Sequence, residues 1–397
     1  MMSEAIRTLR GTDATGLYPL PSGADCSIRR YKRDANAKRV LYVAEGLDRT
    51  WSQKEVWAII ESLERQGMRV TLLTTPKDDG CNLRQSFSIV KARSKWSMIM
   101  YLLTKAWQYD AVITYVTRSY AVMLPIIKML TGIRYVLKSD GFIFSPGQMG
   151  ELIPGTIWWR VRFADLLLVE SPRIRESFAR IVPRRNMLLC PNSVFERKLS
   201  KLLQEFSHKA GQKDSRHIIL FVGRIVPSKG VHLLVSSFRS LANEFPDWHL
   251  VLVGLPKDTH YVSSIARSIN EAPLRGRVHV IGYVDDADLH RFFYEADILC
   301  LPSYSEGSSN VIPRAMFFSN AIVASDVGET PYQLDEGRCG LLFERGSEKQ
   351  LEECLRRLMS DVDLRGTLGS RARHRVLQLF TWERNMEGFL QRVLTVL

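Results

Sequence analysis

Paired cysteines are missing from this sequence. Its cysteines are scattered, with no CxxC pair and no regular spacing: Cys26, Cys81, Cys190, Cys300, Cys339 and Cys354. Zinc sites and disulfide frameworks both need thiols at defined spacings, so the sequence argues against either. We expect reduced thiols and a cytoplasmic location.

Long apolar runs are missing as well. The opening residues, MMSEAIRTLRGTDATG, lack the apolar core of a secretory signal peptide. No stretch reaches the roughly 18 uninterrupted apolar residues that a membrane-spanning helix requires. Hydrophobic residues make up 45% and charged residues 24% of the chain, which are globular proportions. We therefore expect a protein that is soluble or lies on a membrane surface, here the inner face of the cell membrane.

Positive charge is concentrated in the first half of the chain. Residues 1–197 hold 30 Lys and Arg against 18 Asp and Glu, whereas the other residues hold 25 against 24. A basic half suggests an anionic partner. Zinc-finger, RNP-like and basic heptad motifs are absent, so we do not expect nucleic acid. An anionic membrane surface fits better, and charge that only keeps the protein soluble is the alternative.

Strand and helix patterns alternate along the chain from Arg39. RVLYVAEG and MRVTLLTTP have the composition of buried strands, and SQKEVWAIIESLERQG between them has the period of an amphipathic helix ending at Gly67. A second series of such strands begins at HIILFV. Two such series predict an α/β fold class with two doubly wound, Rossmann-like domains. Ligands of such sheets bind at the carboxyl ends of the strands.

The domain boundaries follow from composition. The expected parts are a loose N-terminal lead over 1–38, a first domain over 39–197, a polar helical linker over 198–215, a second domain over 216–378 and a final helix over 379–397.

One candidate site is GRIVPSKG, directly after the strand IILFV. Gly223 allows a tight turn, and Arg224 and Lys229 then lie beyond the strand tip near the start of the next helix. Two cations beside a helix N-terminus suit a diphosphate. A surface turn with two solvated cations is the alternative.

Small residues follow the strand DILCLP in a second candidate site, SEGSSNVIPRAM, from Ser305 to Met316. Their N–H groups can approach a ligand closely, and the helix that follows favours a phosphate. Glu306 fits there if it accepts hydrogen bonds from sugar hydroxyls. A helix N-terminal acid that satisfies the dipole is the alternative.

Taken together, four stretches resemble the second domain of GT-B retaining glycosyltransferases of family 4: GRIVPSKG, SEGSSNVIPRAM, AIVASDVGETPYQLDEGRCGLLF and FTWERNMEGF. The resemblance covers about residues 216–397, and the first half agrees only in its strand–helix plan and its approach to the linker. It implies a GT-B fold whose two Rossmann-like domains face a central cleft. It also implies that the final helix returns to the first domain.

The resemblance implies roles for individual residues. Arg224 and Lys229 would hold the donor diphosphate, and Glu306 would contact the donor sugar. The further donor-binding residues would be Gly223 in the first loop, Gly282, Tyr283 and Val284 along the base pocket, and Gly307, Ser308, Ser309, Asn310 and Val311 around phosphate and sugar.

Arg314 departs from the family pattern, which is Glu, seven residues, Glu, with ribose bound by the second glutamate. A guanidinium has no acceptor, so Arg314 cannot take over that contact. It could contact phosphate, pair with Glu306 or face outward. A lost carboxylate hydrogen bond costs about 1.5–3 kcal/mol, which weakens binding and leaves the fold intact. We keep Arg314 among the donor-binding residues, with altered ribose recognition.

The first half holds no histidine, although the family often places one near the transferred sugar. In VLKSDG that position is taken by Asp140, with Lys138 nearby. The glycine pair that often follows the first strand is reduced to Gly46. Gly46, Lys138 and Asp140 are therefore the expected acceptor-side residues.

The implied chemistry requires no cofactor or metal. In the retaining transfer that the resemblance implies, the nucleoside diphosphate leaves from the same face of the sugar that the acceptor hydroxyl approaches. The departing phosphate can itself take the proton of that hydroxyl. Arg224 and Lys229 would stabilise the leaving charge. Asp286-Ala287-Asp288 spells a DxD motif, but it is better interpreted as a helix start with Asp285 as N-cap. We expect a UDP or GDP sugar as the donor.

Two basic and aromatic stretches in the first half indicate the acceptor. They are KARSKWSMIMYLLTKAWQY over 91–109 and GTIWWRVRF over 155–163. Tryptophans beside Lys and Arg on a short helix suit a lipid headgroup interface. Helices simply packed on their sheet are the alternative.

The sequence thus predicts a retaining, metal-independent glycosyltransferase acting on a glycan or lipid-linked acceptor, in bacterial surface polysaccharide or glycolipid synthesis. A non-catalytic binding or scaffold protein with a ribose site impaired by Arg314 is one alternative. A nucleotide-sugar epimerase or hydrolase is another, less favoured because the first half has no histidine for acid–base work.

Overall fold

The structure is a computed structural model that describes residues 37–47, 54–76, 87–139, 155–209 and 216–397. The chain divides into residues 1–37 and a compact unit over residues 38–397. Asp140, Cys26, Cys81 and nearly all of the expected lead over 1–38 lie outside the described residues.

The first sheet has seven strands in the order β3-β2-β1-β4-β5-β6-β7, and every neighbouring pair is parallel. Its strands are β1 (Arg39–Leu47), β2 (Arg69–Pro76), β3 (Ser88–Lys91), β4 (Ala111–Tyr115), β5 (Arg134–Lys138), β6 (Leu166–Val169) and β7 (Met187–Leu189). Central strands of a parallel sheet are buried on both faces, which explains the unbroken apolar runs in the sequence.

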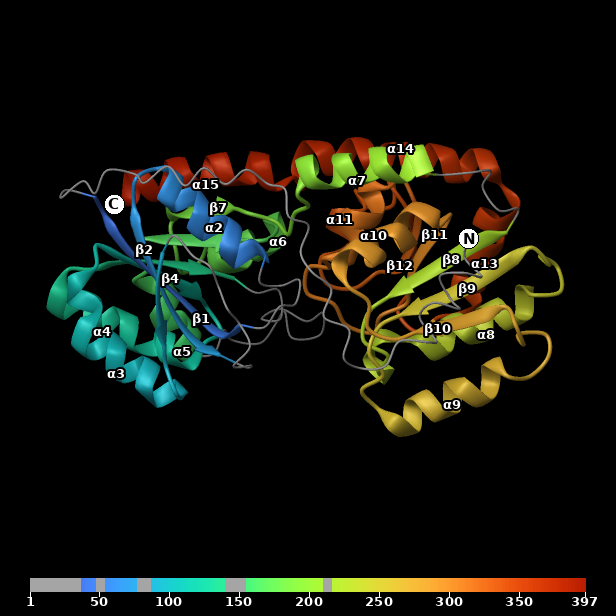
Figure 1. Cartoon of the computed structure of the whole chain (residues 1–397), viewed down its shortest axis with the longest axis horizontal. Coiled ribbons are helices and arrows are strands. Elements are labelled where there is room, and N and C mark those ends of the chain that lie inside the picture. Colours follow the sequence, from blue (N-terminus) through green and yellow to red (C-terminus); the bar gives the residue numbers. More distant parts are fainter. Residues whose placement is uncertain (1–36, 48–53, 77–86, 140–154, 210–215) are drawn as a thin grey trace. The chain divides into compact units, whose positions relative to one another are not determined.

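Helices cover both faces of this sheet (Figure 1). They are α2 (Lys54–Arg65), α3 (Lys95–Lys105), α4 (Leu124–Thr131), α5 (Gly155–Arg162) and α6 (Pro172–Phe178), with 3-10 turns over Ala106–Gln108, Ser119–Met123 and Arg184–Asn186. Alternate side chains of β1 enter two different cores. Leu41 and Val43 pack with α3 to α6, whereas Val40 and Tyr42 pack with α2.

The second sheet has six parallel strands in the order β10-β9-β8-β11-β12-β13. Its strands are β8 (His217–Val222), β9 (Trp248–Val253), β10 (Val278–Ile281), β11 (Ile298–Leu301), β12 (Ala321–Ser325) and β13 (Leu341–Phe343). The helices are α8 (Val231–Leu241), α9 (Thr259–Ile269), α10 (Asp286–Glu295), α11 (Val311–Phe317), α12 (Thr330–Gln333), α13 (Glu348–Ser360) and α14 (Val362–Leu379), with a 3-10 turn over Pro227–Lys229. Both sheets therefore have the doubly wound order expected of Rossmann-like domains.

The last helix, α15 (Trp382–Val396), packs on the first sheet. Four side chains at helical spacing enter the core that contains Val40 and Tyr42: Trp382, Met386, Phe389 and Val393. The Glu383 carboxylate accepts hydrogen bonds from the backbone N–H groups of Glu196 and Arg197, at 3.1 Å each. It thereby caps the start of α7 (Glu196–Lys209).

Some elements differ from the sequence prediction. The short strands β3 and β13 were not predicted. Residues 119–132, expected as one helix, form a 3-10 turn followed by α4, because Pro125 lies in the first turn of α4 and favours a helix start there. Within the expected linker over 198–215, the described residues belong to α7, which begins before it at Glu196.

Two further observations concern bulk properties. Among the described residues, no helix is both long and apolar enough to cross a membrane. Cys190, Cys300, Cys339 and Cys354 are free and buried, and burial raises the pKa of each thiol.

Candidate functional site

The two candidate loops follow neighbouring strands. β8 and β11 pair through Ile219 and Ile298, although β9 and β10 lie between them in the chain. The chain therefore proceeds from β8 to β9 toward one edge of the sheet, and from β11 to β12 toward the opposite edge. In doubly wound sheets, this change of direction opens the space where ligands bind.

Glycines allow the two loops to approach each other. Gly230 has a left-handed backbone with φ 65°, and a Cβ there would lie 1.9 Å from the Pro302 carbonyl oxygen. The backbone N–H of Tyr304 donates to the Ser228 carbonyl oxygen at 2.9 Å. The loop after β8 thus rests directly on the loop after β11, and any side chain at residue 230 would separate them.

Lys229 and Glu306 meet where the loops touch. The Lys229 Nζ lies 2.6 Å from the Glu306 Oε1, with only 19% and 13% of the two side chains exposed. Ser303 Oγ donates to the same carboxylate oxygen at 2.6 Å. A charge-assisted hydrogen bond at low exposure is stronger than a surface ion pair. Two residues expected at the site are therefore brought into contact, while Arg224 on the same loop has an exposed side chain.

The small-residue stretch is held by backbone and amide contacts. The Gln333 side chain accepts from the Ser309 N–H at 3.3 Å and donates to the Ser309 carbonyl oxygen at 2.8 Å. Gly307 accepts from the Glu329 N–H at 3.0 Å, and Asn192 Nδ2 donates to the Ser308 carbonyl oxygen at 2.9 Å. These contacts fix Gly307, Ser308 and Ser309 in front of α11, which Asn310 precedes and Val311 begins.

Burial also changes the pKa of a carboxyl group, that of Glu329, next to the small-residue stretch. Glu329 is buried, and desolvation raises the pKa of its carboxyl group, although Ser171 and Arg173 act in the opposite direction. Gly328 allows the close packing here, because a Cβ on it would lie 2.0 Å from the Glu306 carbonyl oxygen.

Arg314 lies in the core and faces α10. Its side chain is 3% exposed, and its guanidinium lies 3.6 Å from the Asp286 carboxylate. Burial lowers the pKa of Arg314 to about 9, opposed by the Asp286 charge. Asp286 also contacts Lys198 Nζ at 2.8 Å and His290 Nδ1 at 3.7 Å. None of the three settings expected for Arg314 included Asp286. Facing outward and pairing with Glu306 are both corrected, because the Arg314 side chain is buried against Asp286 and Glu306 pairs with Lys229. Its contact with the donor stays a prediction.

The DxD-like segment begins a helix, as expected. The Asp285 carboxylate caps α10 by accepting from the N–H groups of Ala287 and Asp288 at 2.9 Å. Among the described residues, no group of three or more His, Cys, Asp and Glu side chains is arranged to hold a metal ion.

A histidine and two tyrosines beside the loops were not singled out from the sequence. His232 Nδ1 lies 2.8 Å from the Tyr261 hydroxyl, and its Nε2 lies 3.3 Å from the Tyr304 hydroxyl. Burial lowers the pKa of His232, opposed by Glu348. The only signal available was the position of Tyr304 next to SEGSSN, because His232 and Tyr261 come from two other elements.

The other expected residues are not gathered at these loops by any described contact. Tyr283 is 63% exposed and, with Gly282 and Val284, follows the edge strand β10. Gly46 lies at an irregularity in the register of β1 with β2. Lys138 is buried at the end of β5, with its Nζ 5.8 Å from the centre of the Tyr115 ring. The base-pocket and acceptor-side roles stay predictions.

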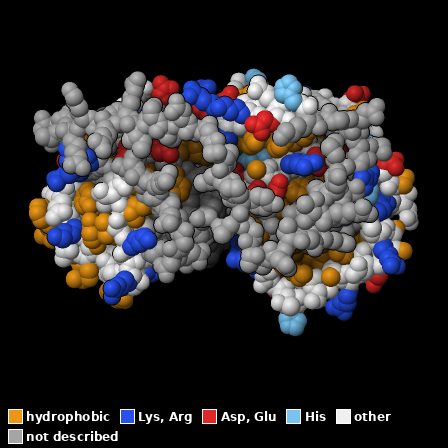
Figure 2. Space-filling view, in the orientation of Figure 1, with side chains coloured by type: hydrophobic (Ala, Val, Ile, Leu, Met, Phe, Trp, Pro, Cys, Tyr) orange, Lys and Arg blue, Asp and Glu red, His pale blue; other side chains and the backbone are white. Residues whose placement is uncertain are grey.

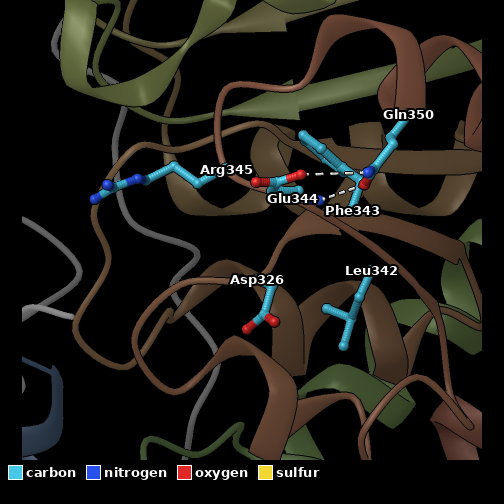
Figure 3. A pocket seen from close by; sticks show the side chains of 6 residues that line it. All are labelled: Asp326, Leu342, Phe343, Glu344, Arg345 and Gln350. Carbon is cyan, nitrogen blue, oxygen red and sulfur yellow. Dashed lines mark hydrogen bonds between the residues drawn. The ribbon is translucent and has the colours of Figure 1, made fainter. Parts of the chain in front are cut away.

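A hollow of about 380 Å³ lies beyond the ends of β12 and β13 (Figure 3). It is lined by Asp326, Leu342, Phe343, Glu344, Arg345 and Gln350. Figure 3 shows the Gln350 side-chain amide hydrogen-bonded to Glu344, while the Arg345 side chain is directed away from both. Its volume is within the range of small-molecule sites, and the sequence did not single out any of its residues.

Comparisons with known proteins show what this chain is similar to. Residues 204–375 match the family model described as glycosyl transferases group 1. The capsular polysaccharide biosynthesis glycosyltransferase CapM of Staphylococcus aureus is 27% identical over 197 residues, covering 48% of this chain and 48% of that protein. An alpha-maltose-1-phosphate synthase of Mycolicibacterium smegmatis is 31% identical over 186 residues, covering 45% and 47%. The chain spans about half the length of the curated relatives it matches.

Solved structures match over most of the chain. A sucrose-phosphate synthase from Thermosynechococcus elongatus has a TM-score of 0.70 at 19% identity, covering 90% of this chain and 99% of that one. Anabaena HepE, solved in complex with UDP and glucose, has a TM-score of 0.70 at 17% identity, covering 90% and 100%. These similarities establish the GT-B fold that the sequence resemblance implied.

Proposed function

We propose that the protein is a glycosyltransferase, because residues 204–375 match the family model described as glycosyl transferases group 1. It would move a sugar from a nucleotide-diphosphate sugar, of UDP or GDP type, to a glycan or lipid-linked acceptor. The observation that carries this proposal is the contact of Lys229 with Glu306 where the β8 and β11 loops meet.

The loop chemistry supports a diphosphate leaving group. As the bond from the sugar C1 to the diphosphate oxygen breaks, negative charge grows on that oxygen. Lys229 and the exposed Arg224 would stabilise this charge. Glu306 can accept hydrogen bonds from sugar hydroxyls once the diphosphate draws Lys229 away from it. Cations supplied by the chain itself are the basis for proposing transfer without a metal.

Retention of configuration would follow from attack on the same face. The acceptor hydroxyl would form its bond to C1 on the side from which the diphosphate departs, and its proton would pass to the departing phosphate oxygen. This step needs no dedicated general base. It does need a positioned acceptor, which we assign to the first-sheet side near Gly46, Lys138 and Asp140.

The setting we propose is the synthesis of a bacterial surface polysaccharide or glycolipid at the cytoplasmic face of the membrane. CapM, named for capsular polysaccharide biosynthesis, supports the first part. The basic first half supports peripheral contact with an anionic membrane.

Calorimetric titration tests the proposal. UDP, GDP, ADP, TDP and CDP would each be added, with a chelator present, to the wild type and to Arg224→Ala. Arg338→Ala is the matched control, because its side chain is 79% exposed and lies beside Asp335, which belongs to neither loop. We expect one diphosphate to bind, and Arg224→Ala to weaken it about tenfold or more, the effect of one charge-assisted contact.

Other outcomes separate the alternatives. If none of the diphosphates binds, the scaffold function is favoured instead. Turnover of the nucleotide sugar without any acceptor would favour an epimerase or hydrolase. The anomeric configuration of the product, read by NMR, tests retention.

A further inference from the structure

Helices α3, α4 and α5 lie together on one face of the first sheet. Their inward side chains share one core, which includes Met98 and Leu102 of α3, Leu124 and Ile127 of α4, and Val161 of α5. Their outward side chains are also apolar. Nine of the fourteen large hydrophobic side chains that are exposed among the described residues lie on these helices or directly after them: Trp96, Met100, Leu103, Trp107, Ile126, Met129, Leu130, Trp158 and Phe163. We call these nine residues the helical patch.

The spacing of the exposed apolar side chains on α3 places them on one side of the helix. Trp96, Met100, Leu103 and Trp107 recur every three or four residues and therefore form one stripe along α3 and the turn that follows it. A surface helix normally presents a polar face to water, whereas α3 exposes this apolar stripe beside only a few exposed polar side chains, which include Lys95, Thr104 and Lys105. The most exposed members are Trp96 at 76%, Met129 at 74% and Leu130 at 78%. The sequence did not single out α4, which supplies the last two.

The charge around the helical patch has one sign. The three helices contain five Lys and Arg and not one Asp or Glu. Lys105 and Arg162 are exposed, as are Lys91 and Arg93 just before α3. Figure 2 shows apolar side chains with cations scattered among them, in the region where Figure 1 places α3 and α4.

Three of the five cations already have a partner within the chain. Arg160 is buried and donates to the Val116 carbonyl oxygen at 2.6 Å, so its expected place at a lipid surface is corrected. Lys128 pairs with Asp165 at 2.7 Å. Lys95 lies 3.1 Å from Glu45. The exposed cations that remain face solvent beside exposed apolar groups.

We infer that the helical patch docks on the surface of an anionic lipid bilayer. Tryptophans with Lys and Arg beside them suit the level of the headgroups, and the aliphatic members would enter the acyl boundary. α3 has 11 residues, and no described helix is long and apolar enough to cross a bilayer, so the helices would lie on the surface. A second copy is a poorer occupant, because a two-fold contact would set the same cations against each other without facing carboxylates.

Vesicle flotation tests this docking, which rests on the proposed membrane contact and not on sugar transfer. Vesicles of phosphatidylcholine, with or without phosphatidylglycerol, would be mixed with the wild type and with Met129→Ser/Leu130→Ser. Val362→Ser and Leu394→Ser are matched controls, because both side chains are exposed outside the helical patch. We expect wild type and controls to float only with phosphatidylglycerol, and the double variant to bind at least tenfold more weakly.

Charge is tested separately with Lys105→Gln, which we expect to weaken binding about fivefold, an effect that salt would mask. The inference is overturned if the wild type does not float with phosphatidylglycerol, or if the double variant floats as well as the controls. It is also overturned if sedimentation shows a dimer that the double variant dissolves. Diphosphate binding, measured by calorimetry on the same variants, should not change, so failure of docking and failure of the proposed transfer are distinguishable.

Discussion

Lys229 and Glu306 are separated by 77 positions in the chain, yet they form a hydrogen-bonded ion pair with the Lys229 Nζ 2.6 Å from the Glu306 Oε1. The pair exists because β8 and β11 are neighbours in the sheet and because Gly230 lets their loops touch. It also gives each residue a competitor for its proposed ligand group. Lys229 must leave Glu306 to reach a phosphate, and Glu306 must lose Lys229 to accept from a sugar.

Glu306→Gln tests this competition. The substitution removes the charge that holds Lys229 but keeps the size of the side chain. We expect diphosphate binding to stay the same or become tighter, while sugar transfer falls by about 10²-fold, the scale of one transition-state contact. Calorimetry and a transfer assay on the same preparation would check both. Weaker diphosphate binding in this variant would contradict the idea that Glu306 restrains Lys229.

Gly230→Ala tests the contact between the loops. A methyl group at residue 230 would lie 1.9 Å from the Pro302 carbonyl oxygen, and φ is 65°. Gly276→Ala is a matched control, since Gly276 has φ 79° and nothing within 4 Å of its Cβ position. We expect the control to lose about 1–2 kcal/mol of unfolding free energy from its backbone alone. Gly230→Ala should lose about 4 kcal/mol or more, measured in urea.

Equal losses in the two glycine variants would mean that the β8 loop moves away from Pro302 without penalty. Calorimetry on any folded Gly230→Ala protein adds a second observation. Diphosphate binding should fall in this variant and stay at the wild-type level in Gly276→Ala.

Arg314→Glu tests the setting of the buried guanidinium. This change restores the carboxylate of the family pattern, but it would place that carboxylate against Asp286 in the core. We expect a loss of about 3–5 kcal/mol in unfolding free energy, as for a broken buried pair. Arg314→Met should lose less, because Asp286 keeps Lys198 and no second carboxylate is buried.

Urea unfolding of both Arg314 variants gives the comparison. Arg314→Glu combined with Asp286→Asn should recover part of the loss, since the two positions are in contact. If Arg314→Glu alone were as stable as the wild type, the guanidinium would not depend on Asp286.

Glu329→Gln tests the effect of burial on pH dependence. The folded protein raises the pKa of the Glu329 carboxyl group above its unfolded value of about 4.3. Stability from a raised pKa is fully present below the unfolded value and is lost as pH rises through the folded value. We therefore expect Glu329→Gln to match the wild type in acid and to become relatively more stable toward neutral pH. A difference that does not vary with pH would contradict a raised pKa.

The sequence predicted most strands of both sheets because central parallel strands are short continuous apolar runs, which their length and their flanking residues distinguish from helices. It did not predict β3 and β13, although β6 and β7, of the same four and three residues, were predicted, so short length alone does not explain the difference. The two loops at the proposed site were predicted because their residues follow strands directly.

The setting of Arg314 could not be predicted in the same way. Its contact with Asp286 depends on how α11 packs beside α10, and no local pattern encodes that packing. The cluster of His232, Tyr261 and Tyr304 likewise gathers residues from three separate elements. Arg160 has the sequence context of a surface residue, but it is buried and donates to the Val116 carbonyl oxygen, a contact that no local pattern encodes.

The packing of α15 on the first sheet has a consequence for the order of folding during synthesis. Val40 and Tyr42 are among the earliest described residues to be made, but the core around them is completed by Trp382, Met386, Phe389 and Val393. The ribosome must translate the whole second sheet before those four side chains exist. One apolar face of the first sheet therefore stays uncovered by α15 while the second sheet is translated. During this interval the growing chain is exposed to aggregation and to capture by chaperones.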